Sequence, residues 1–143
     1  MDEIITEEHS ELYTPYEQAC LQCIDDLYHT AYFVLVDTDA AEKLVTEICV
    51  AGVHKYDHLE DEAEIRFRLT SELYHRIKRK LWFCTPNTDV LPEQLQVLTK
   101  QERLIVAMRF SSGLSVENSM RILGMTLDEY RKRVTDIMRK HTC

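Results

Sequence analysis

The stretch GLSVENSMRILGMTLDEYRKR, residues 113–133, decides how the C-terminal part of the chain folds. It predicts two short helices separated by a glycine turn. Ser115 is placed to cap the first helix, Gly124 to end it in a left-handed conformation, and Thr126 to cap the second helix. This layout is typical of a helix-turn-helix, in which the second helix enters the DNA major groove.

Capping boxes predict further helix starts along the chain. In a capping box a Thr side chain accepts from the backbone N–H three residues later, and a Glu at that position bonds back. The pattern occurs at Thr14–Glu17, Thr99–Glu102 and Thr126–Glu129, and Asp39–Glu42 resembles it with Asp as the cap. Together with apolar residues at helical spacing, these signals predict the following helices: 15–36, 39–56, 60–83, 91–98, 100–110, 116–123 and 127–140.

Composition and one break in the pattern predict an all-α protein of two small helical domains. Only three glycines and three prolines occur in 143 residues, and 45% of the residues are hydrophobic, which favours helices around a real core. The segment CTPNTD, residues 84–89, interrupts the helical pattern because Pro86 disfavours a helix at the residue before it. We therefore expect a helical domain over 1–83, a short linker over 84–90 and a helix-turn-helix domain over 91–143.

Charge is distributed unevenly along the chain. The formal net charge of −8 opposes binding to DNA, which mainly attracts Lys and Arg. Residues 1–65 carry −15, whereas residues 66–90 carry +4 and residues 91–143 carry +3. Because electrostatic steering depends on local fields as well as on the total charge, two basic zones remain available to nucleic acid.

Other features exclude several classes of protein. The N-terminus lacks the basic start and apolar run of a signal peptide, and no stretch reaches the ~18 apolar residues of a membrane span, so we expect a cytoplasmic protein without membrane contact. The five cysteines favour reduced thiols over a disulfide framework. The sequence has no glycine-rich phosphate loop, His-Glu-x-x-His pattern or nucleophile motif, so we expect neither an enzyme nor a cofactor.

A zinc site is the main alternative use of the cysteines. Cys20 and Cys23 share one helix face near His29, and His54 and His58 would add two ligands. However, the latter two histidines fall in a polar, charged segment, and cysteine is commonly a small core residue. We therefore expect no metal.

Residues 20–141 resemble bacterial RNA polymerase sigma factors of the small extracytoplasmic-function type. The motif AEKLVTE at 41–47 is similar to the family's D-x-x-A-E-D-L-V-Q-E in sigma region two, and a basic helix follows it. LS at 114–115, ILGMT at 122–126 and Arg133 resemble the region-four pattern L-S-x-x-E-I-A-x-x-L-G-x-S-x-x-T-V-x-x-R. The two motifs occur in the family's order, with the basic helix and the linker between them.

The resemblance implies a transcription initiation factor that associates with RNA polymerase core and directs it to promoter DNA. In the family the region-two motif docks on the clamp helices, the basic helix melts the upstream edge of the bubble, and region four reads the distal promoter element. An anti-sigma factor is a further partner implied in this way. The implied DNA-binding residues are Arg131, Lys132, Arg133, Thr126, Arg76, Lys78, Arg79 and Lys80. The implied polymerase-binding residues are Asp39, Glu42, Leu44, Val45 and Glu47.

The sequence departs from the family pattern in both regions. Lys43 stands where the family has Asp, which alters the charge of the docking motif. The Trp and Asn landmarks of the bubble-melting helix have no clear counterpart, and Tyr74 and His75 would stack on an unpaired base instead, at ~1–3 kcal/mol each. Buried packing suits Tyr74 better than stacking on a base.

In the helix-turn-helix, Asn118-Ser119-Met120 replaces the family's Glu-Ile-Ala. Ser119 therefore brings a hydroxyl to an expected core position, where an unpartnered hydroxyl costs about 1–3 kcal/mol. Asp128 and Glu129 place negative charge where DNA would approach the second helix. The alternative interpretation is a sigma-derived regulatory or adaptor protein that acts through protein–protein contacts without sequence-specific DNA binding.

Overall fold

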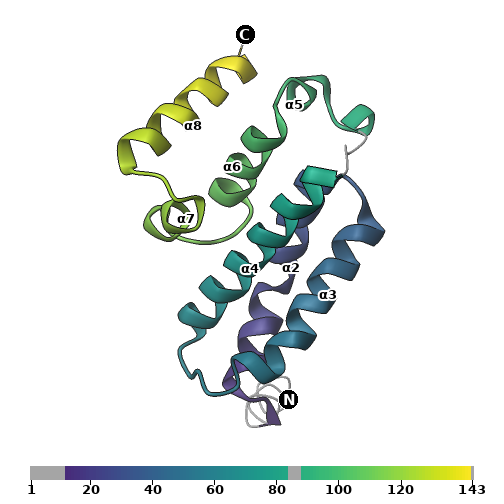
Figure 1. The fold of residues 1–143 in the computed structure, drawn as a ribbon, viewed down its shortest axis with the longest axis vertical. Helices are drawn as coiled ribbons and strands as arrows, with labels where there is room; N and C mark the ends of the chain where they lie inside the picture. Colours follow the sequence, from purple (N-terminus) through teal and green to yellow (C-terminus); the bar gives the residue numbers. More distant parts are fainter. Residues whose placement is uncertain (1–11, 84–87, 143) are drawn as a thin grey trace, which may run out of the picture.

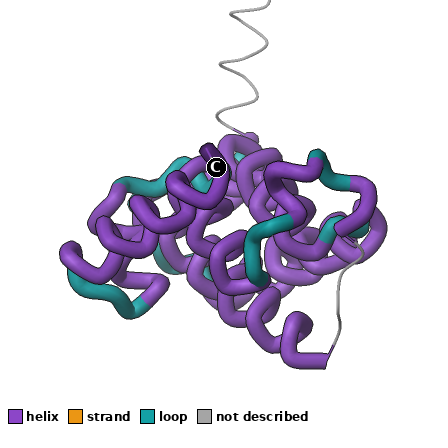
Figure 2. The backbone as a smooth tube through the Cα atoms, turned by 90° about the horizontal axis from the view of Figure 1, so that it is seen from above, coloured by secondary structure: helices purple, strands orange, loops and turns teal. Residues whose placement is uncertain are grey.

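The structure, a computed structural model, describes residues 12–83 and 88–142, and these residues form helices and connecting turns without any strand (Figures 1 and 2). The helices are α2 (Pro15–Leu35), α3 (Thr38–Lys55), α4 (Glu62–Phe83), η1 (Thr88–Val90), α5 (Glu93–Gln96), α6 (Lys100–Phe110), α7 (Val116–Leu123) and α8 (Leu127–Thr142). The all-α fold class is confirmed. The helix predicted over 91–98 is confirmed only in part, because the structure has the four-residue α5 there, after the 3₁₀ turn η1. Of the expected linker over 84–90, residues 84–87 lie outside the described residues.

Local capping explains where the long helices begin. The Thr14 side chain accepts from the backbone N–H three residues later, and Thr99 forms a complete capping box at the start of α6. The predicted cap at Asp39 is wrong. The Asp37 carboxylate caps α3 instead, by accepting from a backbone N–H at 3.0 Å, and Asp39 lies in the first turn, where the helix dipole favours its charge.

Helices α2, α3 and α4 pack side by side as a three-helix bundle (Figure 1). The buried face of α4 is an apolar stripe with one residue per turn: Ile65, Leu69, Leu73 and Ile77, each 0% exposed. This stripe meets apolar residues of α2 and α3 in one continuous core. The opposite face of α4 carries mainly polar side chains, with Phe67 among them.

The same core continues into the C-terminal helices. Leu104, Ala107 and Met108 of α6 and Ile122 of α7 belong to the cluster that α2–α4 form. A second, smaller cluster joins α8 to α6, and its fully buried members are Leu98, Ile105, Tyr130 and Ile137. Helix α6 therefore contributes to both clusters.

Two arginines add polar links between the first three helices and the rest. Arg66 on α4 pairs with Asp26 on α2 at 2.8 Å, and it also donates to the Ser112 carbonyl in the turn before α7, at 3.4 Å. Arg103 on α6 is 3% exposed and donates to the Val34 carbonyl near the end of α2, at 2.8 Å. Burial lowers the pKa of the Arg103 guanidinium. These links hold α6 and α7 against the bundle.

The helix-turn-helix forms as the sequence predicts. Ser115 caps α7, and Gly124, with φ 67°, ends it in the left-handed conformation. Ser119 is 1% exposed, and its hydroxyl donates to the Met108 carbonyl at 3.1 Å. Because the buried hydroxyl has a partner, the penalty expected for an unpartnered one does not arise. Across the described parts of the chain, every helix is too short or too polar to cross a membrane.

Candidate nucleic-acid interface

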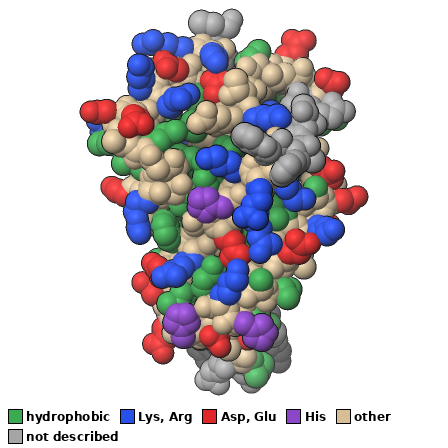
Figure 3. All heavy atoms as spheres, viewed as in Figure 1, with side chains coloured by type: hydrophobic (Ala, Val, Ile, Leu, Met, Phe, Trp, Pro, Cys, Tyr) green, Lys and Arg blue, Asp and Glu red, His purple; other side chains and the backbone are tan. Residues whose placement is uncertain are grey.

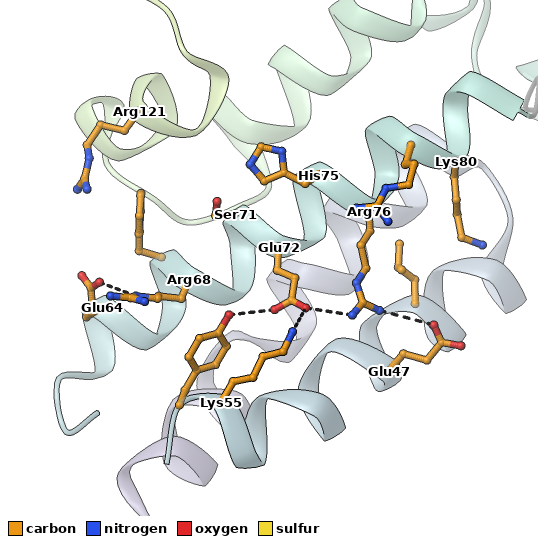
Figure 4. A pocket seen from close by; sticks show the side chains of 14 residues that line it. Glu47, Lys55, Glu64, Arg68, Ser71, Glu72, His75, Arg76, Lys80 and Arg121 are labelled. Atoms are coloured by element: carbon orange, nitrogen blue, oxygen red, sulfur yellow. Dashed lines mark hydrogen bonds and ion pairs between the residues drawn. The ribbon is translucent and has the colours of Figure 1, made fainter. Parts of the chain in front are cut away.

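A groove of about 860 Å³ runs along the outward face of α4, between α3 on one side and α7 on the other (Figure 4). Positively charged side chains outnumber carboxylates in its lining. The cations are Lys55, Arg68, Arg76, Arg79, Lys80 and Arg121, and the carboxylates are Glu47, Glu64 and Glu72. Lys and Arg side chains are accordingly visible along this face of the molecule, interspersed with carboxylates (Figure 3).

A hydrogen-bonded network around Glu72 occupies the middle of the groove (Figure 4). The Glu72 carboxylate accepts from Lys55 Nζ at 2.9 Å, from the Tyr56 hydroxyl at 3.0 Å and from Arg76 at 3.0 Å. Arg76 also lies 3.8 Å from the Glu47 carboxylate. Burial alone raises the pKa of Glu72, but the hydrogen bonds from Lys55 and Tyr56 and the nearby positive charges outweigh it and lower the pKa. The cations of this network are therefore largely neutralised within the fold.

The end of the groove nearest the C-terminus of α4 carries uncompensated positive charge. Arg79 and Lys80 are exposed there, and neither has a hydrogen bond or ion pair with another described residue. His75 is also exposed and lines the groove between these cations and α7 (Figure 4). Phosphate groups of a nucleic acid are attracted to such cations without an existing ion pair having to break.

The other end of the groove combines a cation with an aromatic ring. The Arg121 guanidinium of α7 lies 4.4 Å from the centroid of the Phe67 ring on α4, a cation–π contact. Arg121 also donates to the Asn118 side chain at 3.3 Å, and it pairs with no carboxylate among the described residues. Arg68 is neutralised by Glu64 at 2.9 Å. A flat, positively charged surface is the kind on which a base stacks next to its phosphate.

Of the four α4 cations predicted to bind DNA, three line this groove: Arg76, Arg79 and Lys80. Lys78 is exposed, but its ammonium lies 5.9 Å from the Tyr74 ring centroid and is not part of the lining. Tyr74 is 8% exposed, so the preference for buried packing is confirmed and the ring is not available to a base. His75 is the aromatic residue of this pair that remains accessible.

The three predicted cations on α8 are exposed: Arg131, Lys132 and Arg133. None of them has an ion pair with a described residue. Lys132 and Arg133 share a shallow hollow with the carboxylates of Glu129 and Asp136, which reduce the local positive charge. The Thr126 hydroxyl is engaged in capping α8, because it accepts from the Glu129 N–H at 3.2 Å.

The residues assigned to polymerase divide into an accessible and a buried group. Asp39, Glu42 and Glu47 are exposed along α3. Leu44 and Val45 are 2% and 3% exposed and belong to the core of the bundle. In this conformation a partner can contact the three carboxylates, whereas the two apolar side chains act by holding α3 in place.

Sequence reasoning did not select several groove residues: Lys55, Phe67, Arg68, Ser71 and Arg121. Helical spacing along α4 carries a signal for Phe67, Arg68 and Ser71, because they fall on the face opposite its apolar stripe. No local signal identifies Lys55 or Arg121, because the fold brings each of them to α4 from another helix.

No group of three or more His, Cys, Asp or Glu side chains within residues 12–83 and 88–142 is arranged to hold a metal ion.

In comparisons with known proteins, the chain matches no protein-family model, and no curated protein or solved structure is significantly similar to it. The charge and geometry of the groove and of α8 therefore carry what can be inferred about function.

Proposed function

We propose that the chain is a DNA-binding transcription initiation factor that associates with bacterial RNA polymerase core and directs it to promoters. The observation that carries this proposal is a set of exposed cations on two helices of an otherwise acidic protein, none of which forms an ion pair with a described residue. Arg79 and Lys80 lie on α4, and residues 131–133 lie on α8. Cations free of ion pairs are the ones a protein uses to replace the counterions of DNA.

In this proposal the helices take the roles that the sigma-like motifs imply. Helices α2–α4 act as a region-two-like domain, in which the α4 groove holds the strand of an opened promoter. Helices α6–α8 act as a region-four-like domain, and α8 lies in the major groove. The exposed carboxylates Asp39 and Glu42 are the accessible part of the polymerase-docking motif.

A specific observation supports a second candidate, an adaptor that binds polymerase without sequence-specific DNA contacts. Asp128 and Glu129 are exposed in the first turn of α8, and Asp136 lies beside Lys132 and Arg133. These carboxylates repel phosphate groups close to the helix that would enter the major groove. The adaptor retains the docking surface on α3 and loses only promoter selectivity.

Co-purification with bacterial core polymerase, followed by selection of promoter fragments at two salt concentrations, separates the two candidates. For an initiation factor, the holoenzyme enriches a defined sequence, and enrichment weakens as salt rises. Polymerase binding with no enriched sequence supports the adaptor. A chain that does not bind polymerase at all contradicts both.

Charge-removing variants test which surface contacts DNA. The double variant Arg79→Ala, Lys80→Ala removes the uncompensated charge of the groove, and Arg131→Ala removes charge from α8. Each lost phosphate contact lowers the slope of log affinity against log salt by ~0.7–0.9. Lys43→Ala, an exposed cation on α3, is the matched control, measured at saturating polymerase so that docking does not limit the result. If the wild type, the double variant, Arg131→Ala and Lys43→Ala all give the same slope of log affinity against log salt, neither the groove nor α8 contacts DNA.

A further inference from the structure

Three hydrogen-bond donors in the middle of the α4 groove converge on one carboxylate, that of Glu72 (Figure 4). Lys55 Nζ and the Arg76 guanidinium donate to the same oxygen, Oε1, at 2.9 and 3.0 Å. The Tyr56 hydroxyl donates to the other oxygen, Oε2, at 3.0 Å. Two cations and a hydroxyl therefore surround a single anionic group, an arrangement that suits a phosphate as well as a carboxylate.

The fold positions these donors independently of Glu72. Lys55 is the last residue of α3 and Tyr56 is its C-cap, so the end of that helix places both. The Tyr56 ring packs against the Tyr16 ring of α2, with 6.3 Å between the ring centroids. Arg76 lies on α4, which its buried apolar stripe anchors in the core of the bundle. Because three helices position the donors, the site should keep its shape when the carboxylate is removed.

The two cations are more accessible to solvent than the carboxylate between them. The Glu72 side chain is 15% exposed, whereas the side chains of Lys55 and Arg76 are 51% and 30% exposed. Without Glu72 the two positive charges would lie close together and repel each other, because both now donate to the same oxygen atom. Glu47, at 3.8 Å from Arg76, would offset only part of that charge. An anion from solvent would then neutralise both cations and accept three hydrogen bonds.

We propose that Lys55, Tyr56 and Arg76 form a phosphate-binding site that Glu72 occupies in place of a phosphate. Glu72 thereby limits how strongly the groove binds nucleic acid, a consequence that rests on the proposed function. Contacts between the wild-type groove and phosphate groups are confined to the cations at its two ends, and the middle of the groove accommodates a strand without pairing with its charge. Glu72 therefore determines how many phosphates the groove can engage.

Inorganic phosphate tests the site on the full-length chain in the absence of DNA. The variants are Glu72→Ala and, as the matched control, Glu62→Ala, which removes the same charge from the same helix outside the groove lining. Melting temperatures are compared in phosphate and in chloride at the same ionic strength. Phosphate should stabilise Glu72→Ala by roughly 4–7 °C more than it stabilises wild type or Glu62→Ala, once its concentration reaches about ten times the dissociation constant of the site.

A second substitution verifies that the phosphate binds to the three donors. In the double variant Glu72→Ala, Lys55→Ala one donor is missing, and the additional stabilisation by phosphate should be lost. Circular dichroism confirms that each variant is folded. The proposal would be overturned by a folded Glu72→Ala protein that phosphate stabilises no more than wild type, or by an effect that persists undiminished without Lys55.

Binding to a single-stranded oligothymidylate at several salt concentrations tests the consequence for the groove. Glu72→Gln keeps the size of the side chain and removes its charge, which makes Lys55 and, in part, Arg76 available to phosphate. We expect the slope of log affinity against log salt to steepen by about 0.7–1.4, as for one to two added phosphate contacts. Glu62→Gln should leave the slope unchanged. A Glu72→Gln slope equal to that of wild type would contradict the role of Glu72.

A failure of the proposed function would give a different result. In that case Arg79→Ala, Lys80→Ala would leave the wild-type slope unchanged, because the groove would not contact DNA. The response of Glu72→Ala to inorganic phosphate does not depend on that outcome, so the phosphate site stands or falls on its own measurement.

Discussion

Gly113 and Gly124 provide a matched pair of substitutions that tests the contact between the two halves of the fold. Both residues have positive φ, 74° and 67°, so alanine is strained at either position. A Cβ at Gly124 meets nothing within 4 Å, whereas a Cβ at Gly113 collides with the Arg66 guanidinium and lies 2.8 Å from the Asp26 carboxylate. The two substitutions share the backbone cost, and only Gly113→Ala displaces the ion pair.

The structure sets the size of the difference. Left-handed backbone costs a residue with a Cβ about 1–2 kcal/mol, so Gly124→Ala should lower the free energy of unfolding by that amount. At Gly113 the crowded atoms are the ends of flexible side chains, which move aside and lose the Arg66–Asp26 pair and the hydrogen bond to Ser112. Because the Asp26 side chain is 40% exposed, solvent screens the pair, and we expect its loss to add only about 1 kcal/mol. Gly113→Ala should therefore cost roughly 2–3 kcal/mol in all.

Urea denaturation followed by far-ultraviolet circular dichroism measures both variants. The decisive comparison repeats Gly113→Ala in an Arg66→Ala background, where the side chain that the new Cβ displaces is already absent. The extra 1 kcal/mol or so should disappear there, and the remaining cost should match that of Gly124→Ala. If the extra cost persists without Arg66, or if Gly113→Ala is no more damaging than Gly124→Ala, the link between α4 and the turn before α7 does not have the role assigned to it.

Three further outcomes follow from buried contacts. Ser119→Ala should lower the free energy of unfolding by about 1 kcal/mol, measured by urea denaturation, because one neutral hydrogen bond is lost while the carbonyl keeps another donor. Burial raises the pKa of Glu102, but hydrogen bonds from Thr99 and Lys140 outweigh it and lower the pKa. The stability that Glu102 contributes is therefore present above the unfolded pKa of about 4.3 and is lost as the pH falls through the lower folded pKa. The melting temperature of Glu102→Gln should therefore decrease less steeply with falling pH than the melting temperature of the wild type. A fragment of residues 1–83 lacks the α6 and α7 side chains that complete its core. Its melting temperature, measured by circular dichroism, should therefore be at least roughly 10 °C below that of the full chain. Equal melting temperatures would show an independent N-terminal domain.

Helix ends were predictable because their signals are local. Ser115 and Thr126 cap α7 and α8, and Gly124 ends α7, as their residue types indicate. The error at α3 is also local in origin, because Asp37 and Asp39 both suit the cap and residue type does not choose between them.

The apolar pair in the docking motif shows the limit of transferring a motif by position. Leu44 and Val45 recur with Ile48 at helical spacing, which already predicts that they face the core, and the structure buries all three. Transferring the whole motif to a polymerase surface included these core residues among the contact residues. Periodicity identifies which side of a motif is accessible, whereas the motif itself does not.

The partner of Ser119 was beyond sequence reasoning for a physical reason. The last carbonyls of a helix have no intrahelical donor, and the Met108 carbonyl belongs to the last turn of α6. Two hydroxyls satisfy it, from Ser112 at 2.6 Å and from Ser119 at 3.1 Å. The Ser119 hydroxyl on α7 thus donates to a carbonyl at the end of α6. This contact depends on how the two helices cross.

The shared core sets a condition on how the two basic surfaces can act together. Separating α6 and α7 from α2–α4 would expose Leu104, Met108 and Ile122, at about 1.5–3 kcal/mol each, or roughly 5–9 kcal/mol in all. A partner that binds only the separated form must offset that free energy through its own contacts, and its apparent affinity falls accordingly. Under the proposed function, promoter DNA therefore binds the α4 groove and α8 in one of two ways. Either the two surfaces keep their present arrangement, or they separate first and polymerase binding offsets the free energy of the separation.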